Sequence, residues 1–211
     1  MKEEQRISKI LETLKKDHPN AKCTLYFKNP LELLVATILS AQCTDQRVNI
    51  VTNSLFKKYR SAKDYANASL GQLEKDIKST GFYKNKAKAL KFSAQTILKE
   101  FDGKVPNTMG SLLTLRGVAR KTANVVLGNA YGITSGIVVD THVTRVSQRL
   151  GLTKNKEAKK IEEDLMRLIP KKDWILFSHL LIAHGRAICT ARSPKCGVCH
   201  LNKICPSAFK V

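Results

Sequence analysis

The chain has 211 residues, of which 43% are hydrophobic and 26% are charged. This length and composition are typical of one or two globular domains and exclude a disordered chain. The 37 Lys and Arg residues against 17 Asp and Glu residues give a formal net charge of +20. A charge of this size favours a polyanionic partner, with nucleic acid first and an anionic membrane surface second.

The first residues lack the apolar core of a signal peptide, and no stretch reaches 18 uninterrupted apolar residues. We therefore expect an intracellular protein that does not insert into a membrane. Disulfides are rare in that compartment. The six cysteines are thus expected to be metal ligands or buried thiols.

Apolar residues recur at helical spacing through most of the chain, which predicts an all-α protein. Asn29-Pro30 opens the first of these core helices, and Thr44 is expected to cap the next one. Ser69 and Gln72 fit a capping box before a helix that stops at Gly81.

The second half of the chain continues the helical pattern. A long basic helix is predicted over residues 84–101, and further helices over 108–114, 120–131, 141–150, 156–169 and 172–184. The one strand-like run, Ile137–Val139, is too short to found a sheet.

The acidic residues are unevenly distributed. Between Gly103 and Lys156 there is one carboxylate, Asp140, among eight Lys and Arg residues, and there is none between Trp174 and Val211. Solvated helix faces explain most lysines in any protein. They do not explain two long stretches nearly free of acid, so the pattern indicates a surface that faces a polyanion.

Four of the cysteines follow the spacing C-x6-C-x2-C-x5-C, which lets them converge on one centre: Cys189, Cys196, Cys199 and Cys205. Thiolates suit zinc or an iron–sulfur cluster, and the spacing alone favours the cluster only weakly. The other two, Cys23 and Cys43, lie in apolar surroundings and are interpreted as core thiols.

The loop after the first of these cysteines contains Arg192 and Lys195 and no acid. Two cations on a loop held by a metal would suit a clamp for DNA phosphates. Electron transfer is the competing use of such a centre, but no other part of the sequence indicates a redox partner site.

A short hairpin around Gly117 joins two predicted helices. Backbone N–H groups in a turn that opens a helix can bind a phosphate oxygen. The alternative is an ordinary corner between helices. The basic neighbours Arg116, Arg120 and Lys121 favour DNA.

Lys121 and Asp140 are the candidates for covalent chemistry. A nucleophilic amine must be neutral, and the positive end of a helix together with Arg120 disfavours the charged form of Lys121. Asp140, which is also a favoured N-cap type, could accept the proton. The alternatives are a phosphate-binding lysine and a purely structural cap.

Five segments, in this order, resemble the endonuclease III family of DNA glycosylases: SAQCTD, GFYKNKA, LRGVARKTANVVLGNAYG, IVVDTH and HGRAICTARSPKCGVC. The resemblance covers essentially the whole chain. It implies the helix–hairpin–helix DNA glycosylase fold, with a groove for DNA between two helical domains. Residues 23–133 would form a six-helix barrel domain, with the hairpin at about 108–131. Residues 1–22 and 134–211 would form the second domain, with a [4Fe-4S] cluster on the loop 189–205.

The resemblance also implies the activity. The protein would be a bifunctional DNA glycosylase and AP lyase that removes oxidised pyrimidines, with Lys121 and Asp140 catalytic. Gln42 and Phe82 would fill the gap left by the extruded nucleotide. The remaining DNA contacts would come from two groups, the hairpin residues Arg116, Gly117, Val118, Ala119 and Arg120 and the residues His142, Arg145, Arg192 and Lys195.

The expected partner is double-stranded DNA with damaged bases or abasic sites, bound by a monomer in the cytoplasm at the nucleoid. Three residues depart from the family pattern. Arg116 replaces a proline, Phe82 replaces a leucine, and Ala119 replaces a glycine. If position 119 required a positive φ, the alanine would be strained there.

Other functions are weighed against this one. A relative of the adenine glycosylase branch would share the cluster spacing but lack a lysine at position 121. A non-catalytic DNA-binding module with a structural metal, or an electron carrier, would need neither Lys121 nor Asp140.

Overall fold

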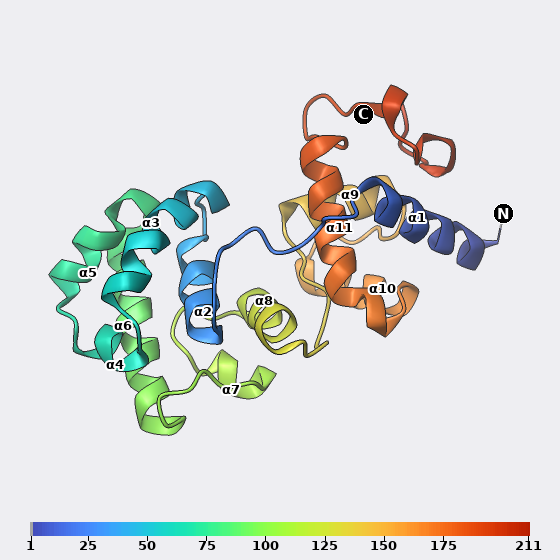
Figure 1. Cartoon of the computed structure of the whole chain (residues 1–211). Coiled ribbons are helices and arrows are strands. Elements are labelled where there is room, and N and C mark those ends of the chain that lie inside the picture. Colours follow the sequence, from blue (N-terminus) through green and yellow to red (C-terminus); the bar gives the residue numbers. More distant parts are fainter. Residues whose placement is uncertain (1) are drawn as a thin grey trace. The chain divides into compact units, whose positions relative to one another are not determined.

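The computed structural model describes residues 2–211, which form helices joined by turns and loops, and no strand occurs in this part of the chain (Figure 1). The all-α prediction is confirmed. Contacts divide the chain into two compact units. The central unit is Cys23–Ser135, and the terminal unit joins the segment that ends at Lys22 to Gly136–Val211.

The helices of the central unit are α2 (Pro30–Leu39), α3 (Asp45–Lys58), α4 (Ala62–Asn67), α5 (Leu70–Ile77), α6 (Tyr83–Glu100), α7 (Met109–Leu113) and α8 (Arg120–Tyr131). A 3₁₀ turn, η1 (Lys78–Thr80), follows α5. Helix α6 packs against α4 and α5, and α2 packs against α8 (Figure 1). Their shared core includes Leu33, Leu73, Ile97 and Leu127, all fully buried. The apolar stripes seen in the sequence are thus the faces that meet.

Local capping explains where these helices begin. The side chain of Asn29 accepts from the Glu32 N–H ahead of Pro30, and that of Thr44 accepts from the Arg47 N–H. Both caps were predicted. Helix α4 was not, although its start carries a complete capping box of Ser61 and Asp64, and S-x-x-D is a recognisable signal for one.

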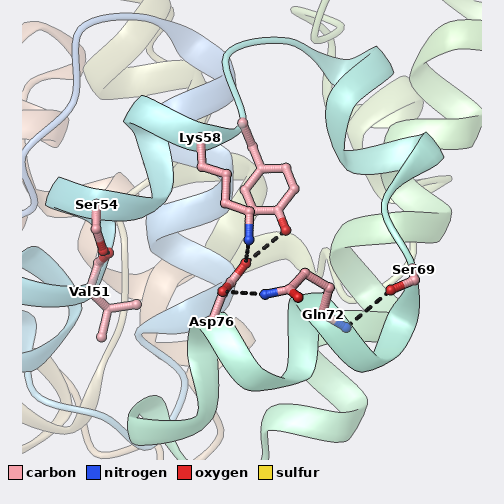
Figure 2. A network of polar contacts seen from close by, with 7 residues as sticks. Val51, Ser54, Lys58, Ser69, Gln72 and Asp76 are labelled. Atoms are coloured by element: carbon pink, nitrogen blue, oxygen red, sulfur yellow. Dashed lines mark hydrogen bonds and ion pairs between the residues drawn. The ribbon is translucent and has the colours of Figure 1, made fainter.

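The predicted capping box at Ser69 is only half formed. Ser69 accepts from the Gln72 N–H, but the Gln72 side chain donates to Asp76 (Figure 2). Asp76 also accepts from Lys58 Nζ at 2.7 Å and from the Tyr59 hydroxyl at 2.8 Å. Burial alone would raise the pKa of Asp76, but these hydrogen bonds outweigh it and lower the pKa. The network ties α5 to the end of α3.

The terminal unit contains α1 (Glu3–Asp17), α9 (Thr141–Arg149), α10 (Ala158–Leu168) and α11 (Trp174–Ala187), with 3₁₀ turns η2 (Lys171–Asp173), η3 (Cys196–Val198) and η4 (Asn202–Ile204). Helix α11 packs against both α1 and α9. Their core includes Leu14, Val143, Phe177 and Leu181, each with no exposed surface. Among the described helices, none is long and apolar enough to cross a membrane.

The Asp76 network gives a pH-dependent prediction. Asp76→Asn is expected to lower the free energy of unfolding by about 1 kcal/mol at neutral pH, since it removes charge-assisted hydrogen bonds at a half-exposed site. The lowered pKa means that this contribution is present above the unfolded-state pKa of about 3.9 and is lost as the pH falls through the folded-state value.

Chemical denaturation as a function of pH measures the effect. Glu74→Gln removes one negative charge from the same helix α5 and is the matched control. Equal effects of the two substitutions at neutral pH would contradict the prediction.

Candidate active site

The predicted hairpin lies between α7 and α8, and Gly117 is its turning point. Gly117 has φ +80°, and a Cβ at this position would lie 2.8 Å from the Cβ of Ala89 on α6. Both the conformation and the close approach therefore require glycine. The Ser93 hydroxyl, also on α6, donates to the Arg116 carbonyl at 2.7 Å. The hairpin backbone is thus fixed directly against α6.

Arg116, which replaces the usual proline of the family, packs on an aromatic ring of α6. The Arg116 guanidinium lies 4.8 Å from the ring centre of Phe92, an arrangement typical of a cation–π contact. Val118, the next hairpin residue expected to touch DNA, is buried and its N–H donates to the Leu115 carbonyl. Its DNA contact stays a prediction.

The alanine in place of the second hairpin glycine is not strained. Ala119 has φ −97° and ψ 172°, an extended conformation open to any residue, and is the N-cap of α8. Its methyl group cannot cap the first turn of the helix, so no side-chain cap is present there. Arg120 and Lys121 follow in that turn, and Lys121 is exposed. The start of α8 therefore offers a helix N-terminus and an accessible amine.

Gln42 and Phe82 share an unusual backbone conformation. They have φ +52° and +48°, in the left-handed region, which costs a non-glycine residue roughly 1–2 kcal/mol. Gln42 lies in the loop between α2 and α3, and Phe82 is the N-cap of α6. Both are exposed, Phe82 to 63%. An exposed phenylalanine held in a strained backbone is typical of a residue with a binding role.

In the terminal unit, Asp140 is the N-cap of α9. Its Oδ1 accepts from the Val143 N–H at 2.8 Å, and the residue is half-buried. The capping role considered from the sequence is therefore present, and the second carboxylate oxygen is not part of this cap. His142 lies in the first turn of α9, and its pKa is lowered. Burial is the main cause, and the nearby Arg145 and Arg186 add to it, while Asp140 acts in the opposite direction.

Arg145 holds α9 to the end of α11. Its Nη2 donates to the Gly185 carbonyl at 2.9 Å and to His142 Nδ1 at 3.2 Å, and its Nε donates to the Cys189 carbonyl. A Cβ on Gly185 would lie 3.0 Å from His142 Nδ1, so glycine permits this packing. The structure thus places Arg145, expected at DNA, in an internal hydrogen-bond network.

The four cysteines with metal-ligand spacing line one cavity of the terminal unit. Cys189, Cys196, Cys199 and Cys205 share it with Ile188, Leu150 and other apolar side chains. Among residues 2–211, no group of three or more His, Cys, Asp or Glu side chains is arranged to hold a metal ion. Burial raises the pKa of the Cys199 and Cys205 thiols, whereas a bound metal cation favours the thiolate form. Cys23 and Cys43 are half-buried beside the central core, less buried than the core-thiol interpretation implies.

Two residues that the sequence analysis missed contact these sulfurs. Arg149 Nη1 donates to Cys189 Sγ at 3.4 Å and to the Thr190 carbonyl at 2.7 Å. His184 Nε2 lies 3.6 Å from Cys199 Sγ, and burial followed by the neighbouring His18 lowers the pKa of His184 to about 4. Arg149 donates an N–H group to sulfur, and His184 does so in the tautomer that carries its proton on Nε2. Hydrogen bonds to cysteine sulfur are the usual outer contacts of an iron–sulfur centre, so the cavity fits a thiolate-bound cluster. The roles of Arg149 and His184 depend on packing between residues distant in the sequence, so no sequence motif identifies them.

The loop after Cys189 carries its cations outward. Arg192 and Lys195 are exposed, while Arg149 Nη2 donates to the Ala191 carbonyl at 3.0 Å and holds the loop from below. The loop is therefore fixed internally and basic on its outer face.

Two family models match the chain. Residues 35–171 match the HhH-GPD superfamily of base excision DNA repair proteins, and residues 189–205 match the iron-sulfur binding domain of endonuclease III. Endonuclease III of Synechocystis sp. is 56% identical over 97% of this chain and 93% of its own length. That of Bacillus subtilis is 47% identical over 91% and 88%. A solved structure of a trapped endonuclease III–DNA covalent intermediate matches with a TM-score of 0.94 and 44% identity, over 100% of this chain and 99% of that one.

The fold and the matched models define a base excision DNA repair protein of the helix–hairpin–helix class. Within that class, the chain belongs to the endonuclease III family. It is a bifunctional DNA glycosylase and AP lyase, and its cofactor is a [4Fe-4S] cluster. The function and cofactor expected from the sequence are confirmed.

The close approach at Gly117 gives a second prediction. Gly117→Ala is expected to destabilise the protein by about 2 kcal/mol or more, because it combines a positive φ with an overpacked contact. DNA affinity is expected to fall as the hairpin moves. Gly110→Ala, within α7 and with no atom within 4 Å of the added Cβ, is the control.

Denaturant unfolding and fluorescence anisotropy with a duplex containing an abasic-site analogue measure the two effects. A Gly117→Ala protein as stable and as tight-binding as Gly110→Ala would show that the hairpin does not need this contact.

Proposed function

We propose that the protein removes oxidised pyrimidine bases from duplex DNA with Lys121 as the nucleophile, and then cleaves the strand by β-elimination. One observation carries this proposal. Lys121 is an exposed amine in the first turn of α8, directly after a hairpin whose glycine is required by its contact with α6.

The proposed chemistry starts with attack by the neutral amine of Lys121 on C1′ of the sugar. The bond between C1′ and the base breaks, and the base leaves with the electron pair and takes up a proton. Opening of the sugar ring gives an iminium ion, the Schiff base. Loss of a proton from C2′ then expels the 3′ phosphate. Water hydrolyses the imine, which restores Lys121 and leaves the unsaturated sugar aldehyde on the end of the cleaved strand.

Asp140 is proposed as the acid–base group of this reaction. Its Oδ1 is bound to the Val143 N–H, which fixes the orientation of the carboxylate. It would accept the proton from Lys121 or stabilise positive charge that develops on the sugar. Capping and catalysis are compatible, since a carboxylate has two oxygens.

Duplex DNA with damaged bases or abasic sites is the proposed partner. The N-terminus of α8 with Arg116 and Arg120 would hold one phosphate segment. Arg192 and Lys195 would hold another. Gln42 would hydrogen-bond the orphaned base, and the exposed Phe82 would wedge into the stack.

The roles of the remaining predicted contacts differ. For His142 and Arg145, whose groups bind each other and α11, we propose that they orient the start of α9. The central unit is proposed to be the barrel domain and the terminal unit the cluster domain. We further propose that a monomer acts at the nucleoid.

Cys189, Cys196, Cys199 and Cys205 are the proposed ligands of the cluster. When bound, the cluster supplies a rigid link between the start and the end of segment 189–205, which keeps its cationic loop in place. Arg149 and His184 would stabilise the thiolates through hydrogen bonds to sulfur.

Borohydride trapping tests the nucleophile. Wild-type protein is expected to form a covalent adduct with abasic DNA and with thymine-glycol DNA, and Lys121→Gln to form none. Lys63→Gln, an exposed lysine on α4, should trap like wild type. Trapping by Lys121→Gln at the wild-type level would exclude Lys121, and absence of any wild-type adduct would favour a non-lyase relative.

Two substitutions at Asp140 separate capping from catalysis. Asn caps as well as Asp, so Asp140→Asn is expected to keep the stability while slowing Schiff-base formation about 100-fold. Asp140→Ala should slow Schiff-base formation by the same factor and also lower the free energy of unfolding by about 1 kcal/mol. Single-turnover trapping and denaturant unfolding measure both. If the Asp140→Asn protein were fully active, Asp140 would have no acid–base role and would serve only as the N-cap of α9.

A further inference from the structure

The first turn of α6 contains a buried lysine that the proposed chemistry does not use. Only 5% of Lys86 is exposed, so its amine needs hydrogen-bond partners inside the protein. Its Nζ donates to the carbonyl oxygens of Leu39 and Thr80, each at 2.8 Å. Both partners are main-chain groups of the central unit.

Each of these carbonyls ends a helix. Leu39 is the last residue of α2, and Thr80 is the last residue of η1. Carbonyls at a helix C-terminus have no intrahelical donor and lie at its negative end. A lysine amine therefore suits both, and it joins two helix ends that are far apart in the sequence.

Both helix ends lead directly into a gap-filling residue. Gln42 comes shortly after Leu39, and Phe82 shortly after Thr80. Among residues 2–211, the non-glycine residues with positive φ are these two, Asp102 and Phe209. A strained backbone persists only where its surroundings hold it. The Lys86 amine hydrogen-bonds to the end of the helix before each of them.

We propose that Lys86 is a positioning residue that fixes the spacing between the Gln42 loop and the Phe82 loop, so that both side chains enter the duplex together. The inference rests on the proposed function, in which these two residues fill the gap beside the extruded nucleotide. Lys86 itself is buried and acts through the loops. Their spacing matters because small misplacements in a site cost large factors in rate.

The same helix offers a matched control. Lys91 Nζ donates to the Ala68 carbonyl at 2.6 Å, and Ala68 is the C-cap of α4. Lys91 is half-buried and ties down a helix end that leads to neither loop. Lys86→Met and Lys91→Met each keep an unbranched side chain and remove one such tie. A merely structural role of Lys86 would make the two variants alike.

Two readouts distinguish them. Single-turnover excision of thymine glycol at saturating protein is expected to slow about tenfold in Lys86→Met and to change less than about twofold in Lys91→Met. A duplex with 2-aminopurine opposite a tetrahydrofuran abasic analogue reports on the orphaned base. Its fluorescence change on binding is expected to fall by at least about half in Lys86→Met only.

A double-mutant cycle tests the route of the effect. In a Gln42→Ala, Phe82→Ala background, Lys86→Met is expected to have no further effect on the excision rate. An undiminished tenfold loss in that background, or a Lys86→Met protein that behaves like Lys91→Met, overturns the positioning role.

Cooperative thermal unfolding shows whether each variant is folded. If Lys86→Met does not fold, Lys86→Gln, which is one bond shorter and retains a donor, replaces it in every arm with the same expected results. Trapping of wild-type protein on abasic DNA keeps the two proposals distinguishable. If the wild-type protein forms no adduct, both the proposed function and the positioning role of Lys86 are overturned. If it forms an adduct but the Lys86 and Lys91 variants excise the base at equal rates, only the positioning role is overturned.

Discussion

The close approach of the hairpin to α6 is the constraint on which the central unit depends. At Gly117 no room is left for a side chain, and the Ser93 hydroxyl fixes the neighbouring carbonyl. The same helix carries Phe92 beneath Arg116, Lys86 near the loop ends and Phe82 at its cap. One helix therefore contacts the hairpin and the helix ends that precede Gln42 and Phe82, so a shift of α6 would be felt at all three places.

Local signals in the sequence were sufficient to predict most of the helices. Asn29, Thr44 and Asp140 were recognisable as caps because capping depends on residues only three positions apart. Gln72 was misjudged since its amide has a competing partner, Asp76, one turn further on. Ala119 raised a doubt about strain that its extended backbone removes, and backbone angles at a single alanine cannot be read from composition or spacing.

The candidate site was partly predictable for a similar reason. Lys121 and the four cysteines stand in recognisable motifs, so they could be named from the sequence. Arg149, His184 and Lys86 could not, because each acts on an atom remote in the chain: a sulfur or a main-chain carbonyl supplied by packing. A lone Arg, His or Lys has no pattern that distinguishes such a role from a solvated surface position.

The contacts of Arg149 have a consequence for assembly of the cofactor domain. Its guanidinium holds the carbonyls of Thr190 and Ala191, and its own carbonyl accepts from Cys205 Sγ. The two guanidinium contacts tie the loop after Cys189 to α9, and the third joins the last of the four cysteines to the end of the same helix. A cysteine that binds iron is a thiolate and has no proton to donate. Cluster insertion therefore exchanges the Cys205 hydrogen bond for an iron–sulfur bond, while the guanidinium contacts to Thr190 and Ala191 need no such exchange.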